Sequence, residues 1–221
     1  MASPDLVRLK LLPVADYVGV NRDDPIRWYS WPVLGTLYRR RVEMCLAECR
    51  GGQRVLEVGF GSGVTFLNLA EKYKEIHGLD LTADVAAVQK MFAARGLQTD
   101  LRNGSVLEMP YPDDHFDTVL LISILEHLKP GQQDAAFAEI RRVLKPGGQV
   151  VYGVPVERAL MVFMFRMMGY NIREHHFSTE KDVAAAAGRQ LEKVRITALK
   201  GAGGLAGAVY EVGHFVKRAG A

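Results

Sequence analysis

The chain has 221 residues, 48% hydrophobic and 24% charged, an ordinary composition for a globular protein that excludes a disordered or collagen-like chain. Lys and Arg exceed Asp and Glu by 28 − 25 = 3, and no cluster of five or six like charges appears, which argues against a nucleic-acid partner. The longest apolar run, Ala159 to Phe165, is far shorter than the roughly 20 residues with which a helix spans a bilayer, so no transmembrane segment is expected.

Two features of the sequence bear on its compartment. The first residues lack the basic region and apolar stretch of a secretory signal peptide. Cys45 and Cys49 are the only cysteines, and two residues four apart on one helix form a poor frame for a disulfide. These observations predict reduced thiols and a cytoplasmic protein.

The first 50 residues predict an N-terminal arm and a helix. Four prolines interrupt residues 1–32, and the expected helix over 33–48 begins after Pro32 and ends before Gly51.

Between residues 51 and 155, short apolar strands alternate with helices. Strands are expected over 54–58, 75–79, 97–102, 118–123 and 149–154, and helices over 64–72, 82–95 (capped by Thr82) and 134–144. Residues 146–148 are expected to end the last of these helices and to start the strand that follows. The alternation predicts parallel β-α-β units with helices on both faces of the sheet.

Residues 156–221 predict a substrate-side segment and a closing hairpin. A Met- and Phe-rich run over 160–168 precedes an expected helix over 178–187 and strands over 191–199 and 208–217. The predicted fold is α/β: a three-layer, Rossmann-like, seven-stranded and mostly parallel sheet with a closing antiparallel hairpin and an N-terminal helical arm. Residues 1–221 are expected to form a single domain.

Three glycines and two acidic residues lie at or just beyond the ends of the first two predicted strands. The first strand ends in Gly59, Gly61 and Gly63, which permit positive φ and let a ligand approach the backbone. Glu57 near its tip is costly to bury without a partner. Asp80 ends the next strand, where a carboxylate can accept hydrogen bonds from ribose hydroxyls. Together they predict an adenosine-containing ligand; the alternatives are a plain strand-to-helix turn and a helix-capping aspartate.

The glycine spacing is Gly-x-Gly-x-Gly, with Val64 where a dinucleotide site would have its last glycine. At this point the sequence resembles the class I S-adenosylmethionine-dependent methyltransferases, specifically their small-molecule branch. Further family-like motifs follow in order over residues 50–155, at Gly78 to Thr82, Leu107 to Asp117, Ile124 to Leu128 and Leu144 to Gly148.

The resemblance implies S-adenosyl-L-methionine as cofactor, with no metal. It implies that Gly59, Gly61 and Gly63 approach the methionine part of this cofactor and that Glu57 orders the loop. It also implies that Asp80 binds the ribose hydroxyls.

For the adenine and the reacting end, the resemblance implies contacts from two further strand ends. Leu81 would lie against the adenine. Ser105, beside Val106, stands where relatives often carry an acidic residue for the adenine amine, so a hydroxyl or backbone group would take that contact. Leu121 and Ile122 would line the floor beside the sulfonium.

Three histidines are weak candidates for a general base. His127 follows the fourth strand, where relatives often carry a histidine near the cofactor, and a helix-start histidine satisfied by backbone groups is the alternative. His175 and His176 lie just past the Met- and Phe-rich run, and a solvated or capping pair before Ser178 is the alternative.

The sequence thus predicts methyl transfer to a small apolar acceptor, such as a quinone-, lipid- or polyketide-like molecule. Core packing on a helix is the favoured interpretation of the run over 160–168. The alternative is an apolar wall that, with Trp28, Tyr29 and Trp31, closes over the acceptor. The alternatives are a catalytically silent S-adenosylmethionine-binding regulator or partner subunit and an NAD-dependent oxidoreductase. A homodimer is left open.

Overall fold

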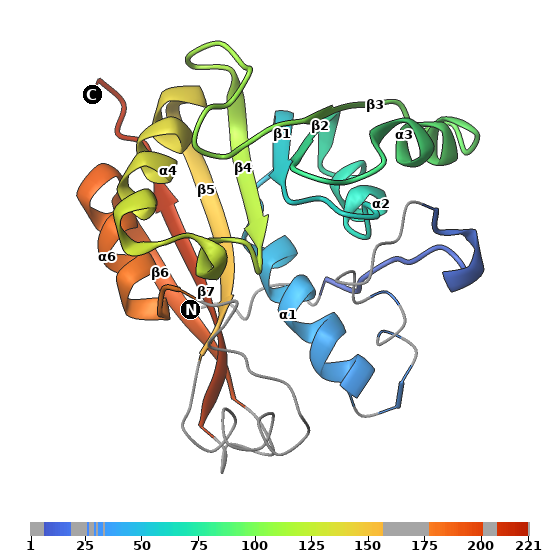
Figure 1. Cartoon of the computed structure of the whole chain (residues 1–221), viewed down its shortest axis with the longest axis horizontal. Helices are drawn as coiled ribbons and strands as arrows, with labels where there is room; N and C mark the ends of the chain where they lie inside the picture. The colour runs from blue at the N-terminus through green and yellow to red at the C-terminus, as the bar shows by residue number, and fades with distance from the viewer. Residues whose placement is uncertain are drawn as a thin grey trace.

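A seven-stranded sheet is the centre of the molecule (Figure 1). The computed structural model describes residues 7–18, 26, 29, 31–32, 34–156, 177–200 and 207–220. Its strands are β1 (Gly52–Val58), β2 (Tyr73–Asp80), β3 (Thr99–Asn103), β4 (Phe116–Ile122), β5 (Leu144–Pro155), β6 (Glu192–Lys200) and β7 (Ala208–Val216). They lie in the order β3-β2-β1-β4-β5-β7-β6.

The sheet is parallel from β3 to β5 and closes with an antiparallel hairpin. The pairs from β3 through β5 are all parallel, as helical connections require. β7 pairs antiparallel with both β5 and β6, and Figure 1 shows the arrows of β4 and β7 pointing in opposite directions. The predicted fold class is confirmed.

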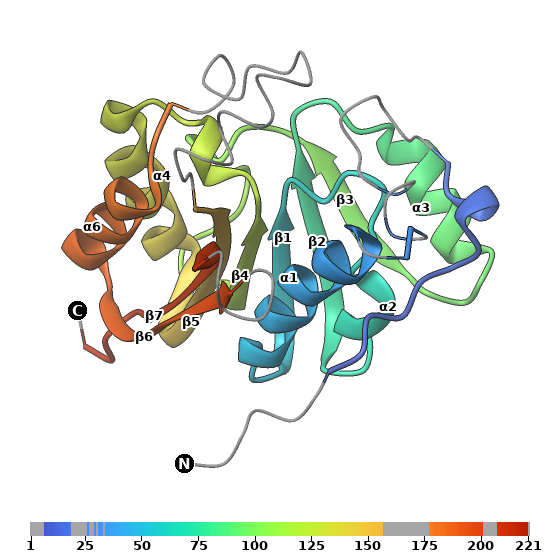
Figure 2. The same cartoon turned by 90° about the horizontal axis from the view of Figure 1, so that it is seen from below.

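Helices cover both faces of the sheet (Figure 2). They are α1 (Leu34–Glu48), α2 (Phe66–Leu69), α3 (Val85–Ala93), α4 (Pro130–Val143) and α6 (Glu180–Gln190), with short 3₁₀ turns η1 (Val14–Asp16) and η3 (Leu125–His127). Successive strand residues serve opposite cores: Leu120 packs with the core of α1, α2 and α3, whereas Val119 and Leu121 pack with that of α4 and α6. This period of two is the physical reason for the three layers.

Several helix boundaries differ from the predicted ones. The helix predicted over 64–72 is only α2, because Gly63 has φ +74° and the residues around it form turns. Asp84, not Thr82, caps α3, since its carboxylate accepts the Ala87 N–H at 3.0 Å. α4 begins four residues before the predicted start, with Pro130 at a first-turn position that tolerates proline.

Two further predicted boundaries shift at the edges of elements. α6 begins at Glu180, because the Thr179 hydroxyl and the Asp182 carboxylate form a reciprocal capping box there. As predicted, α4 ends before residue 145. Residues 145–148, however, already belong to β5. Gly147 lies in the left-handed region at φ +78°, and the register against β4 is irregular there.

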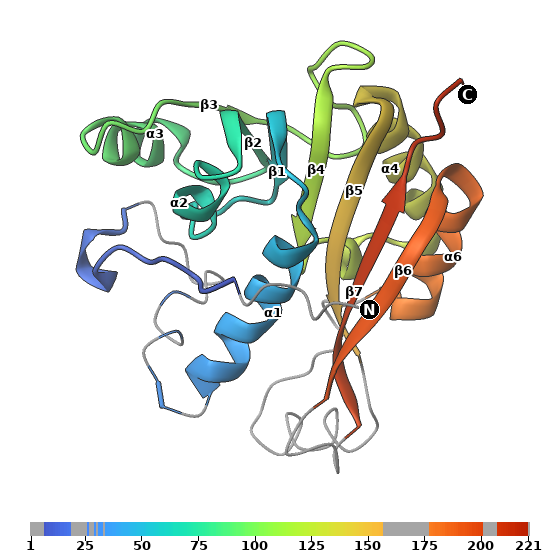
Figure 3. The same ribbon diagram turned by 180° about the vertical axis from the view of Figure 1, so that it is seen from behind.

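The N-terminal segment 7–18 runs past α1 and α2 towards α3 (Figure 3). The Leu9 N–H donates to Glu43 of α1, and the Lys10 N–H donates to Asn68 of α2. Cys45 of α1 and Cys49, the residue after this helix, are buried free thiols. Among the described residues, no helix is both long and apolar enough to cross a membrane.

Candidate functional site

The turn after β1 can be made only by glycines. Gly59, Gly61 and Gly63 have φ of +73°, +52° and +74°, in the region that side chains rarely adopt. A Cβ on Gly59 would lie 2.0 Å from Cδ1 of Ile124, and one on Gly63 would lie 2.7 Å from the Phe66 ring. The backbone of this turn is therefore bare and closely packed from below.

The turn and Asp80 are in direct contact. The Gly61 N–H donates to Oδ2 of Asp80 at 3.0 Å, and the N–H groups of Thr82 and Ala83 both donate to Oδ1 at 2.9 Å. Both lone pairs of Oδ1 are thus used, whereas Oδ2 retains one for a further donor. The partly exposed carboxylate is held in place by backbone groups, with one acceptor position directed away from them.

Glu57 lies beneath the turn and supports it. Its side chain is buried, with 3% of its surface exposed, and its carboxyl group accepts a hydrogen bond from the Thr65 hydroxyl. Burial and, to a smaller extent, the charge of Asp80 raise the pKa of Glu57 to about 8, against the Thr65 hydrogen bond, which lowers it. At neutral pH Glu57 is therefore mostly a neutral acid that ties β1 to the residues after the turn.

The residues predicted to surround the adenine lie at the neighbouring strand ends. Leu81 is 72% exposed directly after Asp80, an apolar surface that a planar ring can cover. Ser105 is partly buried and its hydroxyl accepts the Leu107 N–H at 3.1 Å, while Val106 is buried. In place of an acidic side chain, the Ser105 hydroxyl or a backbone group is therefore available to contact the adenine amine.

Leu121 and Ile122 were predicted to line the cofactor site beside the sulfonium, but only one of them lies on the α1 side of the sheet. Leu121 is fully buried in the core under α4. Ile122 is partly buried and packs against the core under α1.

Only one of the three candidate histidines lies within the described residues. His127 is an exposed residue of η3, and its backbone N–H donates to the Ile124 carbonyl at 3.1 Å. His175 and His176 lie outside the described residues, as do Trp28 and the run over 160–168. Within the described ranges, no group of three or more His, Cys, Asp or Glu residues could hold a metal ion.

Sequence reasoning missed a cluster at the carboxyl end of β4. Arg41 of α1 donates to the Ser123 hydroxyl at 3.5 Å, and that hydroxyl lies 3.0 Å from the Tyr210 hydroxyl of β7. The only signal in the sequence is Tyr38 three residues before Arg41, which places both on one helix face. The three elements involved lie far apart in the chain, so no local pattern predicts their meeting.

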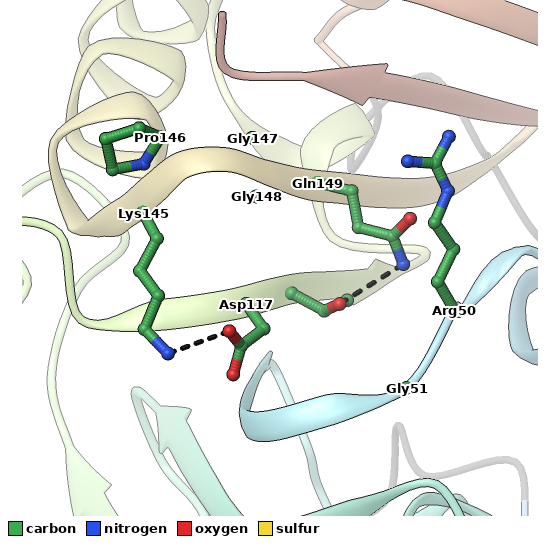
Figure 4. Close-up of a pocket in the computed structure, with 9 residues that line it drawn as sticks. Arg50, Gly51, Asp117, Lys145, Pro146, Gly147, Gly148 and Gln149 are labelled. Atoms are coloured by element: carbon green, nitrogen blue, oxygen red, sulfur yellow. Dashed lines mark hydrogen bonds and ion pairs between the residues drawn. The ribbon is translucent and has the colours of Figure 1, made fainter. Parts of the chain in front are cut away.

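A separate surface hollow lies at the other end of the sheet, at the amino ends of β4 and β5 (Figure 4). There Lys145 pairs with Asp117 at 2.7 Å, and Gln149 donates to Thr118 at 3.1 Å. Asp117 also accepts two backbone N–H groups from β1. Because Asp117 is fully engaged by Lys145 and by the backbone of β1, we interpret the hollow as structural.

Comparison with known proteins agrees with this geometry. Residues 55–148 match the family model described as a methyltransferase domain, which spans the glycine turn, Asp80 and β4. Across 92% of the chain and 96% of its counterpart, the fold matches the N-methyltransferase NodS from Bradyrhizobium japonicum WM9 in complex with S-adenosyl-L-homocysteine, with a TM-score of 0.67 and 18% identity. The chain has the class I methyltransferase fold, and over residues 55–148 it is similar to methyltransferase domains.

Two curated relatives are similar over this domain. The chain is 35% identical to ajmaline N-methyltransferase of Rauvolfia serpentina over 126 residues, covering 53% of the chain and 43% of the relative. It is 30% identical to the ubiquinone/menaquinone biosynthesis C-methyltransferase of Cupriavidus necator over 132 residues, covering 55% of the chain and 54% of the relative. The chain thus spans about half the length of the curated relatives it matches.

The site fits S-adenosylmethionine, the methyl donor that this fold and domain imply. Gly59 and Gly61 are partly exposed and carry no side chain, so a ligand can approach the backbone of the turn there. Asp80 Oδ2 retains an acceptor position for a ribose hydroxyl, and Leu81 provides exposed apolar surface beside it. Together these groups offer the contacts that a nucleoside and its chain need.

Proposed function

We propose that this protein is an S-adenosylmethionine-dependent methyltransferase that acts on a small molecule. The observation that carries the proposal is the 3.0 Å contact between the Gly61 N–H and Asp80, inside the domain that matches the methyltransferase family model. It joins a bare glycine turn and a carboxylate with a remaining acceptor position into one site. The proposal treats residues 1–221 as one domain and the residues of this site as the cofactor contacts.

In this mechanism the protein mainly binds and orients. The bound cofactor supplies an electrophilic methyl group on a sulfonium. The glycine turn holds the methionine part, Asp80 the ribose and Leu81 the adenine. Neutral Glu57 keeps the turn rigid without adding charge beneath it. Aligning donor and acceptor can contribute about 7–11 kcal/mol to the barrier reduction.

The acceptor is proposed to be a small molecule with a largely apolar body. The curated relatives support this class, since their names give an alkaloid N-methyltransferase and a quinone C-methyltransferase. Tyr38, which is partly exposed, packs with the buried rings of Tyr29 and Tyr210 at the carboxyl end of β4 and β5, so the acceptor side is aromatic.

Binding measurements test the cofactor site. We expect isothermal titration calorimetry to show binding of S-adenosylmethionine and S-adenosylhomocysteine and none of NAD. Asp80→Asn should weaken S-adenosylhomocysteine binding at least about tenfold, because a hydrogen bond to a charged group contributes roughly 1.5–3 kcal/mol. Asp84→Asn is the matched control, since asparagine also caps helices and Asp84 bonds only within α3. Equal affinity of the wild type and Asp80→Asn would contradict the assignment.

Turnover separates this proposal from a silent regulator that binds the same cofactor. Transfer of a labelled methyl group from S-adenosylmethionine to pooled small metabolites is the expected result. Tight cofactor binding without transfer across a broad panel would instead favour the regulator or partner subunit.

A further inference from the structure

Arg41, on the acceptor side of the sheet, has no counter-charge among the described residues. Its Nε–H is buried and donates to no group in the part of the chain that the structure describes. No carboxylate in the described part of the chain lies within 4.0 Å of its guanidinium, although Arg54, Arg142 and Arg195 each pair with one. A buried charge is costly unless it is paired, so this arginine calls for another explanation.

The neighbours of Arg41 are neutral and aromatic. Its guanidinium lies 4.1 Å from the centre of the Tyr38 ring and 5.8 Å from that of Tyr210. Burial raises the pKa of Tyr210 well above its ordinary value, with Cys45 adding to the effect and Arg41 opposing it, so Tyr210 is a neutral phenol at neutral pH. The buried carboxyl of Glu126 acts on Tyr210 but lies beyond ion-pairing distance of Arg41.

Ser123 holds the polar end of this cluster in a strained conformation. Its φ is +58°, unusual for a residue other than glycine, and it follows β4 directly. Its N–H donates to the Gly153 carbonyl of β5 at 2.8 Å, and its hydroxyl contacts both Arg41 and Tyr210. Three elements therefore direct polar hydrogens to one place at the carboxyl ends of β4 and β5.

The position of this cluster matches the acceptor and not the nucleoside. The glycine turn and Asp80 follow β1 and β2, whereas the cluster lies over β4, β5 and β7, on the other side of the turn. Ile124, the residue after Ser123, packs directly beneath Gly59. A donor held by the turn would thus have its reacting end towards β4 and the cluster.

We propose that Arg41, with the hydroxyls of Ser123 and Tyr210, binds a carboxylate on the methyl acceptor. The guanidinium fork matches a carboxylate in geometry and charge. One of the two hydroxyls donates to the other, and the second keeps its hydrogen as a further donor at the edge of the carboxylate. The partly exposed ring of Tyr38 then packs against the apolar body of the same molecule. The assignment rests on the proposed function, and it narrows the acceptor to an apolar, preferably aromatic, acid.

A pair of probes tests the site directly: 4-hydroxybenzoate and its neutral analogue 4-hydroxybenzamide, titrated by calorimetry against protein saturated with S-adenosylhomocysteine. We expect the wild type to bind the benzoate roughly tenfold to a hundredfold more tightly than the benzamide. Arg41→Met should abolish this preference and Arg41→Lys should retain part of it. Arg40→Met is the matched control on the same helix and should behave as the wild type.

Three outcomes would overturn the assignment. Equal affinity of the wild type for the benzoate and the benzamide would show that Arg41 does not form an anion-binding site. Weakened S-adenosylhomocysteine binding in Arg41→Met, with unchanged binding of 5′-methylthioadenosine, would assign Arg41 to the carboxylate of the donor. A lowered thermal midpoint in Arg41→Met and Arg41→Lys alike would indicate a structural residue. By contrast, failure of the wild type to bind S-adenosylhomocysteine would refute the proposed function itself.

Discussion

Glu57→Gln tests the protonation state of the acid beneath the glycine turn. The folded protein holds the Glu57 proton up to about pH 8, whereas the unfolded chain releases it near the ordinary pKa of 4.5. The unfolded state therefore binds fewer protons between these values, and stability falls as pH rises through this window. At about 1.4 kcal/mol for each pH unit, the wild type loses on the order of 5 kcal/mol relative to a neutral isostere.

The assay is urea unfolding of both proteins from pH 5 to pH 9. We expect Glu57→Gln to be close to the wild type at pH 5, since its amide oxygen can accept the Thr65 hydroxyl, and clearly more stable at pH 8 to 9. The difference between the two curves isolates residue 57, because every other titrating group is common to both. Exposed Glu71→Gln serves as the control and should follow the wild type. Parallel curves for Glu57→Gln and the wild type would mean that Glu57 is ionised in the folded state.

Two further variants test the packing of the glycine turn and the buried ion pair between Glu48 and His214. Gly59→Ala should lower the unfolding free energy by more than about 2 kcal/mol, because its Cβ would meet Ile124 at 2.0 Å and alanine disfavours φ +73°; Gly131→Ala, with open space around it, should be near neutral in the same denaturation experiment. Glu48→Gln should cost about 2–4 kcal/mol at pH 7, since it leaves buried His214 with a weaker partner. Burial alone would raise the pKa of Glu48, but hydrogen bonds from His214 and Arg195 lower it, so this cost should shrink as pH falls below the ordinary carboxyl pKa of 4.5.

The sequence was most informative where the backbone itself demands a residue type. Gly59, Gly61 and Gly63 are required by positive φ, and Asp80 ends a strand whose neighbours could be read from apolar runs. The three-layer, mostly parallel architecture followed from the alternation of elements. The contact between Gly61 and Asp80 was therefore within reach of sequence reasoning.

Helix ends were less predictable because they depend on side-chain geometry. Thr82 and Asp84 are both capping residue types, and only the structure shows that Asp84 bonds to the third residue of α3 while the Thr82 N–H bonds to Asp80. The start of α4 at Pro130 is similar, since proline after a strand indicates a loop as readily as a first helical turn. The cytoplasmic location and a homodimer stay predictions.

The Arg41 cluster was out of reach for a topological reason. β7 is antiparallel to β5, and their register sets Tyr210 opposite Pro155 while Val216 lies opposite Gln149. The beginning of β7 therefore reaches the same edge of the sheet as the ends of β4 and β5, which in a fully parallel sheet would receive only strand ends. This inversion brings Tyr210 to Ser123, and α1, packed across β4, β5 and β7, brings Arg41 to both. The closing hairpin thus has a consequence beyond covering the sheet: it adds aromatic and hydroxyl groups from the end of the chain to the acceptor side of the site.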